Sequence, residues 1–165
     1  GFSAELCMAW EQAARQAELL GIRVCLLRTG LVIGNNGGFL ARMLPPFKLG
    51  LGGRIGDGRQ WMSWIHLADQ VALTRFLLES PKAHGAFNAT APHPVTNAEF
   101  TRQLARALHR PAVLPLPAWL LKLGAGEMAE LLLGSQNVLP RKAVASGFEF
   151  AYPHLEPALR NVLAG

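Results

Sequence analysis

The sequence predicts an α/β fold that forms the C-terminal part of a doubly wound parallel sheet, with a small α/β domain attached. An amphipathic helix over residues 3–20 leads into an apolar strand over 22–27, and a second buried strand follows at 86–89. The long connection between these strands contains a helix, which is typical of parallel strands joined by a right-handed crossover. Two strands are too few for a stable open sheet. We therefore expect the earlier strands of the sheet to precede residue 1.

The first helix and strand are the clearest elements. The helix over 3–20 has apolar residues at helical spacing and begins at Ser3, whose side chain can cap the exposed amides. Gly21 is expected to end it. The strand over 22–27 is nearly all apolar, as expected for a strand that is covered on both faces.

Prolines and glycines interrupt the next stretch. A short helix is predicted over 39–44, and Pro45-Pro46 is expected to stop it. Residues 50–58 are rich in glycine and form a loop with at most one very short strand. A strand over 61–65 follows.

The rest of the chain alternates helices with short strands. Pro81 ends the crossover helix over 67–78, and Thr96-Asn97-Ala98-Glu99 has the sequence of a capping box at the start of a helix. The other predicted elements are helices over 97–109, 118–123, 126–133, 140–146 and 155–163, and short strands over 86–89, 112–116 and 148–150.

Composition limits the function classes that are open to this chain. Half of the 165 residues are hydrophobic and 16% are charged, which suits a folded core and not a disordered chain. The net charge is +5, but the arginines are scattered and form no basic stripe with interleaved aromatic residues. Nucleic-acid binding needs such a stripe, so we expect no nucleic-acid partner. A few arginines that face an anionic cofactor or substrate fit better.

Several absences shape the remaining expectations. Cys7 and Cys25 form no C-x-x-C motif, so reduced thiols in a cytoplasmic protein are expected. The longest apolar run, 112–121, is too short to span a bilayer, so we expect no membrane partner. The histidines are dispersed without ligand spacing, so no metal site is expected. Residue 1 is not methionine and the helix pattern begins by residue 3, so we expect a longer parent protein.

Two blocks of sequence, with others in order around them, carry a family resemblance. Arg28-Thr29-Gly30-Leu31-Val32 follows a strand, and residues 56–69 run from a glycine turn through an aromatic strand into a helix. Further matching blocks lie at 6–11, 37–53, 88–92, 95–100, 126–128, 136–140 and 145–148. Together they resemble the C-terminal half of an extended short-chain dehydrogenase/reductase. The branch is the NAD-dependent epimerase/dehydratase-like one, which is also labelled cell-division-inhibitor-like.

This resemblance implies a Rossmann-like sheet with a small substrate domain. Residues 1–34 and 67–92 would be the terminal strands and helices of the sheet, and residues 35–66 and 93–165 the substrate-binding domain. Relatives transfer a hydride with NAD or NADP, assisted by a tyrosine whose pKa is lowered by a lysine four residues later. The partners implied are a small-molecule substrate, an N-terminal dinucleotide-binding half and a second copy in a homodimer.

The sequence departs from the family pattern in its chemical machinery. It has no G-x-G-x-x-G, and its one tyrosine, Tyr152, has Glu156 where the lysine is required. Within this resemblance, the spacing back from Glu11 places Cys7 where many relatives carry that lysine. We therefore expect no catalytic residue in this chain and no NAD(P) binding by the chain alone. Met62 stands where sugar-nucleotide relatives carry a phosphate-binding arginine, which argues against such a substrate unless Arg54 or Arg59 takes that role.

The resemblance assigns binding residues at the end of the first strand and in the aromatic strand. The turn after the first strand would lie beside the nicotinamide, and this implies cofactor contacts from Arg28, Thr29, Leu31 and Val32. The alternative is a tight turn that merely needs Gly30 and Gly34. The substrate-binding candidates are Met43, Gln60, Trp61, Trp64 and His66.

Several of these residues also have a structural interpretation. One of the two tryptophans is expected to pack in the core while the other lines a pocket. For His66 and Asp69, capping of the helix start is favoured over catalysis. Ser63, His66 and Asp69 recur every third residue, but a strand–helix junction would splay them, which argues against a catalytic triad.

Two functions are consistent with these features of the sequence. In the first, the chain is the substrate-domain portion of an NAD(P)-dependent epimerase/dehydratase-like oxidoreductase and is inactive by itself. In the second, it is a non-catalytic binding or interaction module that associates through an exposed apolar face.

Overall fold

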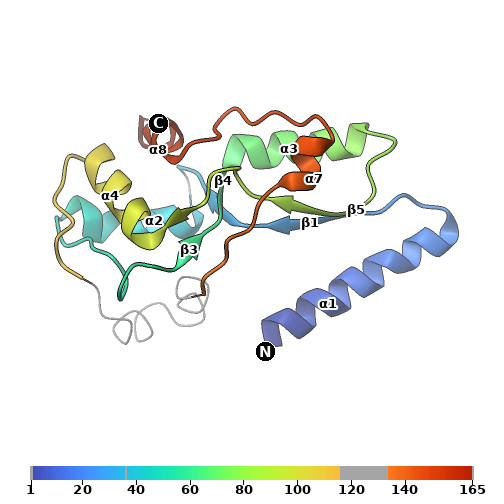
Figure 1. The fold of residues 1–165 in the computed structure, drawn as a ribbon, viewed down its shortest axis with the longest axis horizontal. Helices are drawn as coiled ribbons and strands as arrows, with labels where there is room; N and C mark the ends of the chain where they lie inside the picture. Colours follow the sequence, from blue (N-terminus) through green and yellow to red (C-terminus); the bar gives the residue numbers. More distant parts are fainter. Residues whose placement is uncertain (1, 36, 116–133, 165) are drawn as a thin grey trace.

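The alternation of helices and short strands gives an α/β fold in the computed structural model, which describes residues 2–35, 37–115 and 134–164 (Figure 1). In chain order the elements are α1 (Phe2–Arg15), the 3-10 helix η1 (Gln16–Leu20), β1 (Cys25–Thr29), β2 (Leu31–Ile33), α2 (Gly38–Lys48), β3 (Trp61–Met62), β4 (Trp64–His66), α3 (Leu67–Glu79), β5 (Gly85–Ala89), β6 (Val95–Thr96), α4 (Asn97–Ala107), α7 (Arg141–Ala145) and α8 (Leu155–Ala164). None of the described helices is long and apolar enough to cross a membrane.

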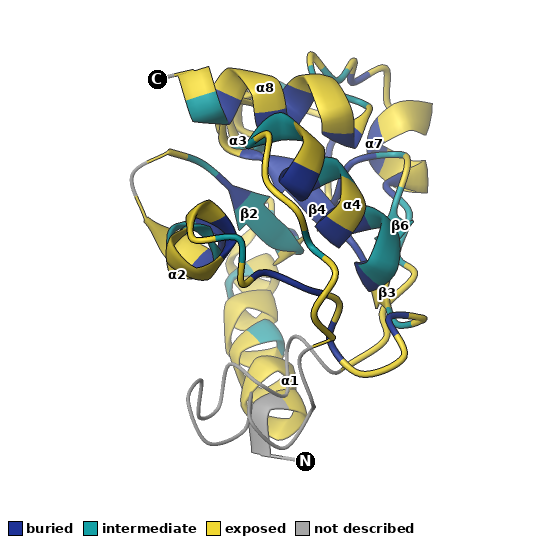
Figure 2. Cartoon of the chain, turned by 90° about the vertical axis from the view of Figure 1, so that its left-hand side faces the viewer, coloured by how far each residue is buried: buried dark blue, intermediate teal, exposed yellow. Residues whose placement is uncertain are grey.

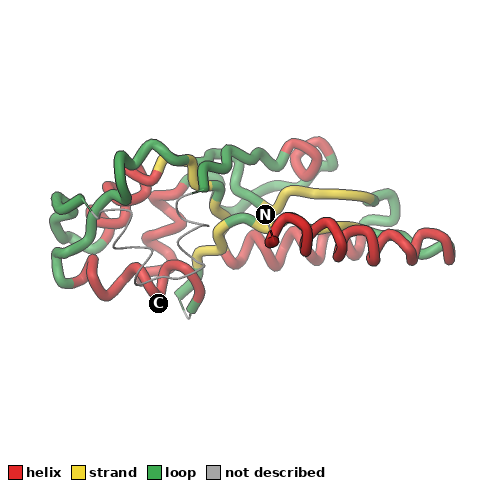
Figure 3. Tube along the Cα trace, turned by 90° about the horizontal axis from the view of Figure 1, so that it is seen from below, coloured by secondary structure: helices red, strands yellow, loops and turns green. Residues whose placement is uncertain are grey.

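The parallel pair expected from the sequence is β1 with β5. The two strands are in register from Cys25 opposite Gly85 to Thr29 opposite Ala89, which confirms the parallel pairing of strands joined through a helix. α3 lies on one side of this pair and α1 on the other (Figures 1 and 3). The arrangement leaves the carboxyl ends of both strands at one edge, where ligands bind in doubly wound sheets.

The first strand begins later than its apolar sequence predicts. β1 starts at Cys25 instead of residue 22, and the Ile22 side chain is 55% exposed. The Arg23 guanidinium donates to the carbonyls of Leu77 and Leu78 at the end of α3, at 3.0 and 2.9 Å. Arg23 therefore fixes the chain against the end of α3 before the strand begins. Hydrophobicity alone does not show such a contact because the partners lie more than fifty residues away.

A second parallel pair lies where the sequence predicts only a tight turn. The segment contains β2, which pairs with β4 so that Leu31 lies opposite Trp64. Gly30 marks the change of partner. Its amide donates to the Ala89 carbonyl of β5 at 3.1 Å, whereas the next amide donates to the Ser63 carbonyl at 2.8 Å. In the sequence, a three-residue strand between two glycines cannot be told from a turn. Only its pairing with β4 shows that it is a strand.

The helix α2 contradicts the prediction that Pro45-Pro46 would stop it. The helix continues through both prolines to Lys48. The proline carbonyls still accept hydrogen bonds, from the amides of Leu49 (3.2 Å) and Leu51 (2.9 Å), so only the donors toward the preceding turn are lost. Phe47 is buried in the core and anchors the end of the helix. Packing therefore outweighs the local preference of the prolines.

Other elements differ in smaller ways. The single strand expected over 61–65 is divided into β3 and β4, and β3 pairs with β6 in antiparallel direction. Residues 112–115 and 148–150 are not strands. Phe148 instead packs edge-on against Phe150 and at a tilt against Phe76, so its burial does not need sheet pairing. The helices predicted over 118–123 and 126–133, and the end of the strand predicted over 112–116, lie outside the described residues.

Two clusters of buried side chains form the core. One joins β1, β5, α3 and the segment around α7, with Leu73, Leu77 and Phe87 among its members. The other lies beneath α2, α4 and α8 and contains Trp64 and Phe100. Figure 2 shows buried residues in β4, α4 and α8, whereas α1 is almost entirely exposed. The division into a sheet portion, 1–34 and 67–92, and a substrate domain, 35–66 and 93–165, stays a prediction.

Candidate functional site

A groove of about 880 Å³ opens beside α1 at the carboxyl end of β1. We call it the α1 groove. Three parts of the chain form it: the face of α1 toward the sheet, the ends of β1 and β5 with the neighbouring loop, and the segment after residue 135. Its lining residues are Ala4, Cys7, Met8, Trp10, Glu11, Ala14, Cys25, Leu26, Leu27, Arg28, Thr29, Gly30, Ser63, Asn88, Thr90, Gln136 and Val138.

An ion pair joins α1 to the end of β1 at this groove. The Arg28 guanidinium donates from Nε to Glu11 Oε1 at 2.7 Å and from Nη2 to Glu11 Oε2 at 2.8 Å. Two parallel bonds of this kind fix the orientation of both side chains. The hydrogen bonds from Arg28 lower the pKa of the Glu11 carboxyl below its ordinary value. The charge of Arg28 is thus already balanced within the described residues.

Polar side chains on the floor of the α1 groove hold the segment after residue 135. Ser63 Oγ donates to the Gln136 carbonyl at 2.6 Å and accepts from the Val138 amide at 2.8 Å. Thr90 Oγ1 donates to the Val138 carbonyl at 3.1 Å, and Asn88 Nδ2 donates to the Leu139 carbonyl at 3.1 Å. These bonds place residues 136–139 as one wall of the groove.

Asn88 and Thr90 are not among the site residues predicted from the sequence, and Ser63 was considered there only as a rejected triad member. Asn88 and Thr90 lie at the carboxyl end of β5, whose pairing with β1 was predicted. Polar residues at that end of a parallel strand are the signal that could have identified them. Their partners at 136–139 are about fifty residues away, so no local pattern predicts the bonds themselves.

His66 lies outside the α1 groove, in a separate hollow of about 550 Å³ between α3 and α8. Its Nδ1 accepts from the Ala68 amide at 3.0 Å, so the side chain caps α3. Nε2 therefore carries the proton and donates to Asn161 Oδ1 at 3.1 Å. The ring stacks on Tyr152 with centroids 4.0 Å apart, and burial lowers the pKa of His66 below its ordinary value. The capping role favoured from the sequence is confirmed.

Ser63, His66 and Asp69 do not converge. Asp69 is buried, and its two carboxylate oxygens accept from the amides of Ala151 and Tyr152 at 2.8 and 2.9 Å. Each of the three side chains has different partners, so the arrangement is not a triad. Among the described residues, no group of three or more His, Cys, Asp or Glu could hold a metal ion.

The predicted cofactor residues divide between the groove and the core. Arg28 and Thr29 line the α1 groove. Leu31 packs against the cluster beneath α2 and α4, and Val32 packs against the cluster of β1 and β5. Contacts between these four residues and a cofactor stay predictions.

The predicted substrate residues are not brought together around the α1 groove. Trp64 is fully buried and its indole N–H donates to the His93 carbonyl at 3.1 Å, so it is the core tryptophan of the pair. Trp61 is 38% exposed. Gln60 donates from Nε2 to the Ile55 carbonyl at 3.2 Å, and Met43 packs against the core. Substrate contacts by Met43, Gln60, Trp61, Trp64 and His66 stay predictions.

The titratable residues of the α1 groove define what it can do chemically. They are Cys7, Glu11, Cys25 and Arg28, and Glu11 and Arg28 are engaged with each other. Cys25 Sγ, on β1, donates to the Ala83 carbonyl at 3.3 Å. The Cys7 thiol, on α1, is exposed and forms no hydrogen bond with a described residue. The groove offers apolar surface, backbone groups and hydroxyls, which suits binding and orientation of a ligand.

Known proteins resemble this chain along most of its length. Residues 3–90 match the family model described as NAD dependent epimerase/dehydratase family, and residues 116–162 match a domain of unknown function (DUF1731). Epimerase family protein Mb2239 of Mycobacterium bovis is 46% identical over 161 residues, which cover 96% of this chain and 53% of the relative. The SDR39U1 homolog of Arabidopsis thaliana, described as chloroplastic, is 44% identical; the match covers 98% of this chain and 46% of the relative.

Solved structures agree with the sequence matches. Human epimerase family protein SDR39U1 (isoform 2), crystallised with NADPH, superposes with a TM-score of 0.82 at 39% identity, covering 86% of this chain and 48% of the human one. A nucleoside-diphosphate sugar epimerase from Corynebacterium glutamicum gives 0.77 at 32% identity, covering 99% of this chain and 31% of the other. The chain spans about half the length of the curated relatives it matches. On the family match over residues 3–90, the chain belongs to the NAD dependent epimerase/dehydratase family.

Proposed function

We propose that this chain is the C-terminal, substrate-domain portion of a cytoplasmic NAD(P)-dependent oxidoreductase. In this proposal it supplies the outer wall of the cofactor and substrate crevice. A dinucleotide-binding half supplies the phosphate-binding turn and the catalytic tyrosine. The observation that carries the proposal is the α1 groove at the carboxyl ends of β1 and β5, which is where doubly wound sheets bind ligands.

The residues of the groove fit the nicotinamide end of such a cofactor. The ends of β1 and β5 offer backbone groups and the Thr29 hydroxyl, and α1 offers an apolar wall with Met8 and Trp10. The sequence has no G-x-G-x-x-G to receive the diphosphate, so that part of the cofactor would rest on the other half. The cofactor would supply or accept the hydride. The residues of this chain would orient the ring and keep water from it.

The similarity to the NADPH-bound human protein supports NADP or NAD as the cofactor of the assembled enzyme. The substrate in this proposal is a small carbonyl or hydroxyl compound. Met62 is buried and cannot neutralise a diphosphate, which argues against a sugar nucleotide at that position.

Reconstitution tests this proposal. The chain would be co-expressed with the part of the Mycobacterium bovis relative that it does not cover, and NADPH fluorescence would be followed in a titration. We expect tight binding by the pair and negligible binding by this chain alone. An Arg28→Gln variant of the chain should weaken binding by the pair, since it releases α1 from the groove. Tight binding by the chain alone, or none by a well-folded pair, would contradict the proposal.

A specific observation favours a second function, that of an interaction module. Met8 and Trp10 on α1 are 62% and 65% exposed, and Leu19 and Leu20 after it are 83% and 79% exposed. Apolar surface of this kind marks association sites. In this alternative the chain associates with a second copy or with another half through α1 and performs no chemistry itself.

Sedimentation velocity separates this alternative from a solitary binding domain. The chain should sediment as a dimer, and Trp10→Ser should shift it toward monomer. Leu78→Ser is the matched control, because Leu78 is 72% exposed but lies on α3. A monomer at all concentrations, with no binding of an apolar dye, would rule the interaction module out.

A further inference from the structure

A second groove, of about 740 Å³, lies along α4 and carries a different chemistry from the α1 groove. We call it the α4 groove. It shares no lining residue with the α1 groove. Its lining residues are Arg54, Ala98, Thr101, Arg102, Ala105, Arg106, His109, Arg110, Ala112, Val113 and Pro115. Four arginines and a histidine line it, and none of its lining residues is a carboxylate.

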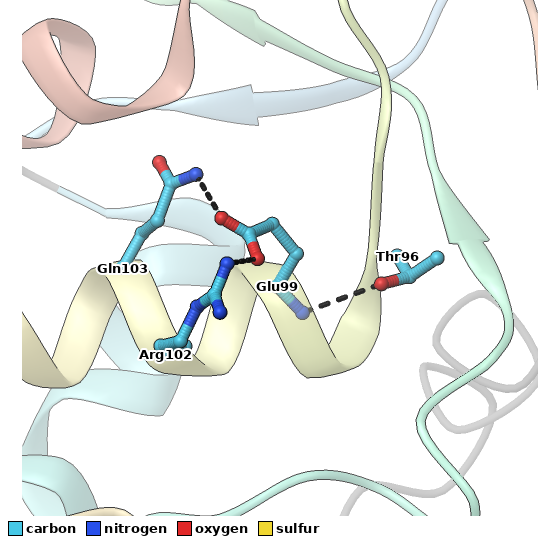
Figure 4. A network of polar contacts seen from close by, with 4 residues as sticks. All are labelled: Thr96, Glu99, Arg102 and Gln103. Atoms are coloured by element: carbon cyan, nitrogen blue, oxygen red, sulfur yellow. Dashed lines mark hydrogen bonds and ion pairs between the residues drawn. The ribbon is translucent and has the colours of Figure 1, made fainter.

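Most of this positive charge is not balanced by described residues. Arg102 pairs with Glu99, which also accepts from Gln103 while its amide donates to Thr96 (Figure 4). Arg54, Arg106 and Arg110 form no ion pair with any residue that the structure describes. Basic residues near a helix C-terminus can be explained by the helix dipole. That explanation suits Arg106 in the last turn of α4 but not Arg54, which comes from the loop before β3.

A buried hydroxyl without a partner is the second observation. Thr101 is 3% exposed and belongs to the lining of the α4 groove, and its Oγ1 has no hydrogen-bond partner among the described residues. Leaving a buried hydroxyl without a hydrogen bond destabilises the fold, so such groups are rare unless they serve a ligand or a water. Thr101 would donate to a ligand oxygen, directly or through one water.

The face of α4 in this groove carries small side chains between long arginine side chains. Ala98, Thr101 and Ala105 follow one another at helical spacing, and Arg102 and Arg106 flank them. Phe100 and Leu104 are buried in the core, and Ala105 lies where the core meets the groove. The result is a floor of small residues bordered by guanidinium groups. Arginine forks bind phosphate oxygens with two bonds at once.

We propose that the α4 groove binds a small molecule that carries phosphate groups, at a site separate from the α1 groove. The volume lies within the range of small-molecule sites. Arg54, Arg106 and Arg110 hold the phosphate oxygens, and Thr101 supplies a hydrogen bond at the floor. The apolar residues Ala98, Ala105 and Val113 receive whatever the phosphate is attached to.

The test is a calorimetric titration of the full chain with pyrophosphate and, separately, with ADP. Binding of both would show that the phosphates alone are recognised, and tighter binding of ADP would show that the attached group also contacts the floor. The double variant R106Q/R110Q should lower the affinity for either ligand by about tenfold or more. Arg141→Gln is the matched control, because Arg141 is exposed on α7 and lines neither groove.

Thr101→Val separates a ligand-binding role from a structural one. Without ligand, its free energy of unfolding should equal or exceed that of the wild type, because the change removes an unpartnered hydroxyl. Affinity for pyrophosphate should fall severalfold. Absence of binding at millimolar concentrations, or equal binding by wild type and R106Q/R110Q, would overturn the proposal. The NADPH titration of the reconstituted pair is repeated with R106Q/R110Q, so that NADPH held by the α4 groove is distinguished from NADPH in the α1 groove.

Discussion

At the residue scale, the polar side chains that stand out in the sequence mostly satisfy backbone groups. The capping role of His66 could be predicted, because a residue before the first turn of a helix commonly accepts from its amides. For Asp69 the sequence predicts a role at the start of the helix, through capping or the helix dipole, whereas its carboxylate binds amides elsewhere in the fold. Its bonds to the amides of Ala151 and Tyr152 join segments 82 and 83 positions apart. Such a contact depends on the finished fold, so local sequence does not reveal it.

Replacing Asp69 should therefore destabilise the protein. An Asp69→Asn side chain keeps the shape but turns one of its two acceptors into a donor that faces a backbone amide. The free energy of unfolding should fall by about 1–3 kcal/mol in urea denaturation. Asp57→Asn is the matched control, because Asp57 is exposed and accepts one local bond from the Arg59 amide. Equal stability of the two variants would contradict the role given to Asp69.

The lowered pKa of His66 gives a pH dependence with a definite sign. Burial keeps the His66 ring neutral in the folded protein. In the unfolded chain the same ring binds a proton once the pH falls below the ordinary histidine pKa of about 6.5. The contribution of His66 to the free energy of unfolding is therefore complete above pH 6.5, and it is lost as the pH falls from about 6.5 toward the pKa of His66 in the folded protein. The free energy of unfolding should thus decline as the pH is lowered from about 7.5 to about 5.5.

The control for this prediction is His66→Asn, which can still cap the helix but does not titrate. Its stability should vary less with pH than that of the wild type. Parallel pH profiles for the two proteins, measured by urea denaturation, would show that another group causes the decline.

At the element scale, long periodic segments were predictable and short pairings were not. α3, α8, β5 and the parallel pairing of β1 with β5 all follow from the sequence. The pairing of β2 with β4 does not, because each strand has only three residues. The α1 groove was likewise predictable only in part. Its position at the end of β1 follows from topology, but its third wall at 136–138 depends on long-range hydrogen bonds.

The change of strand partner at Gly30 makes this position intolerant of a side chain. A Cβ atom there would lie 2.5 Å from the Ser63 carbonyl oxygen and 2.9 Å from Thr90 Cγ2. Gly30→Ala should lower the free energy of unfolding by about 1–3 kcal/mol. Gly34→Ala should cost less, because its nearest contact is the Leu67 side chain at 3.2 Å. Thermal denaturation of both variants measures the difference, and a larger loss for Gly34→Ala would contradict the account of the β1–β2 junction.

At the scale of the whole molecule, the chain combines a well-packed core with an exposed helix. α1 is held beside β1 by the Arg28–Glu11 ion pair, while Met8 and Trp10 stay in contact with solvent. In the proposed function, a dinucleotide-binding half would cover this helix and complete the crevice. The exposed apolar surface of α1 and the α1 groove would then belong to one interface.

The most direct measurement is an NMR titration with NADPH of the isotope-labelled chain, reconstituted with the part of the Mycobacterium bovis relative that it does not cover. The amide signals of Arg28, Thr29 and Gly30 should shift together with those of Asn88 and Thr90, since all five line the α1 groove. Shifts confined to residues away from the ends of β1 and β5 would contradict the claim that this edge forms the cofactor crevice.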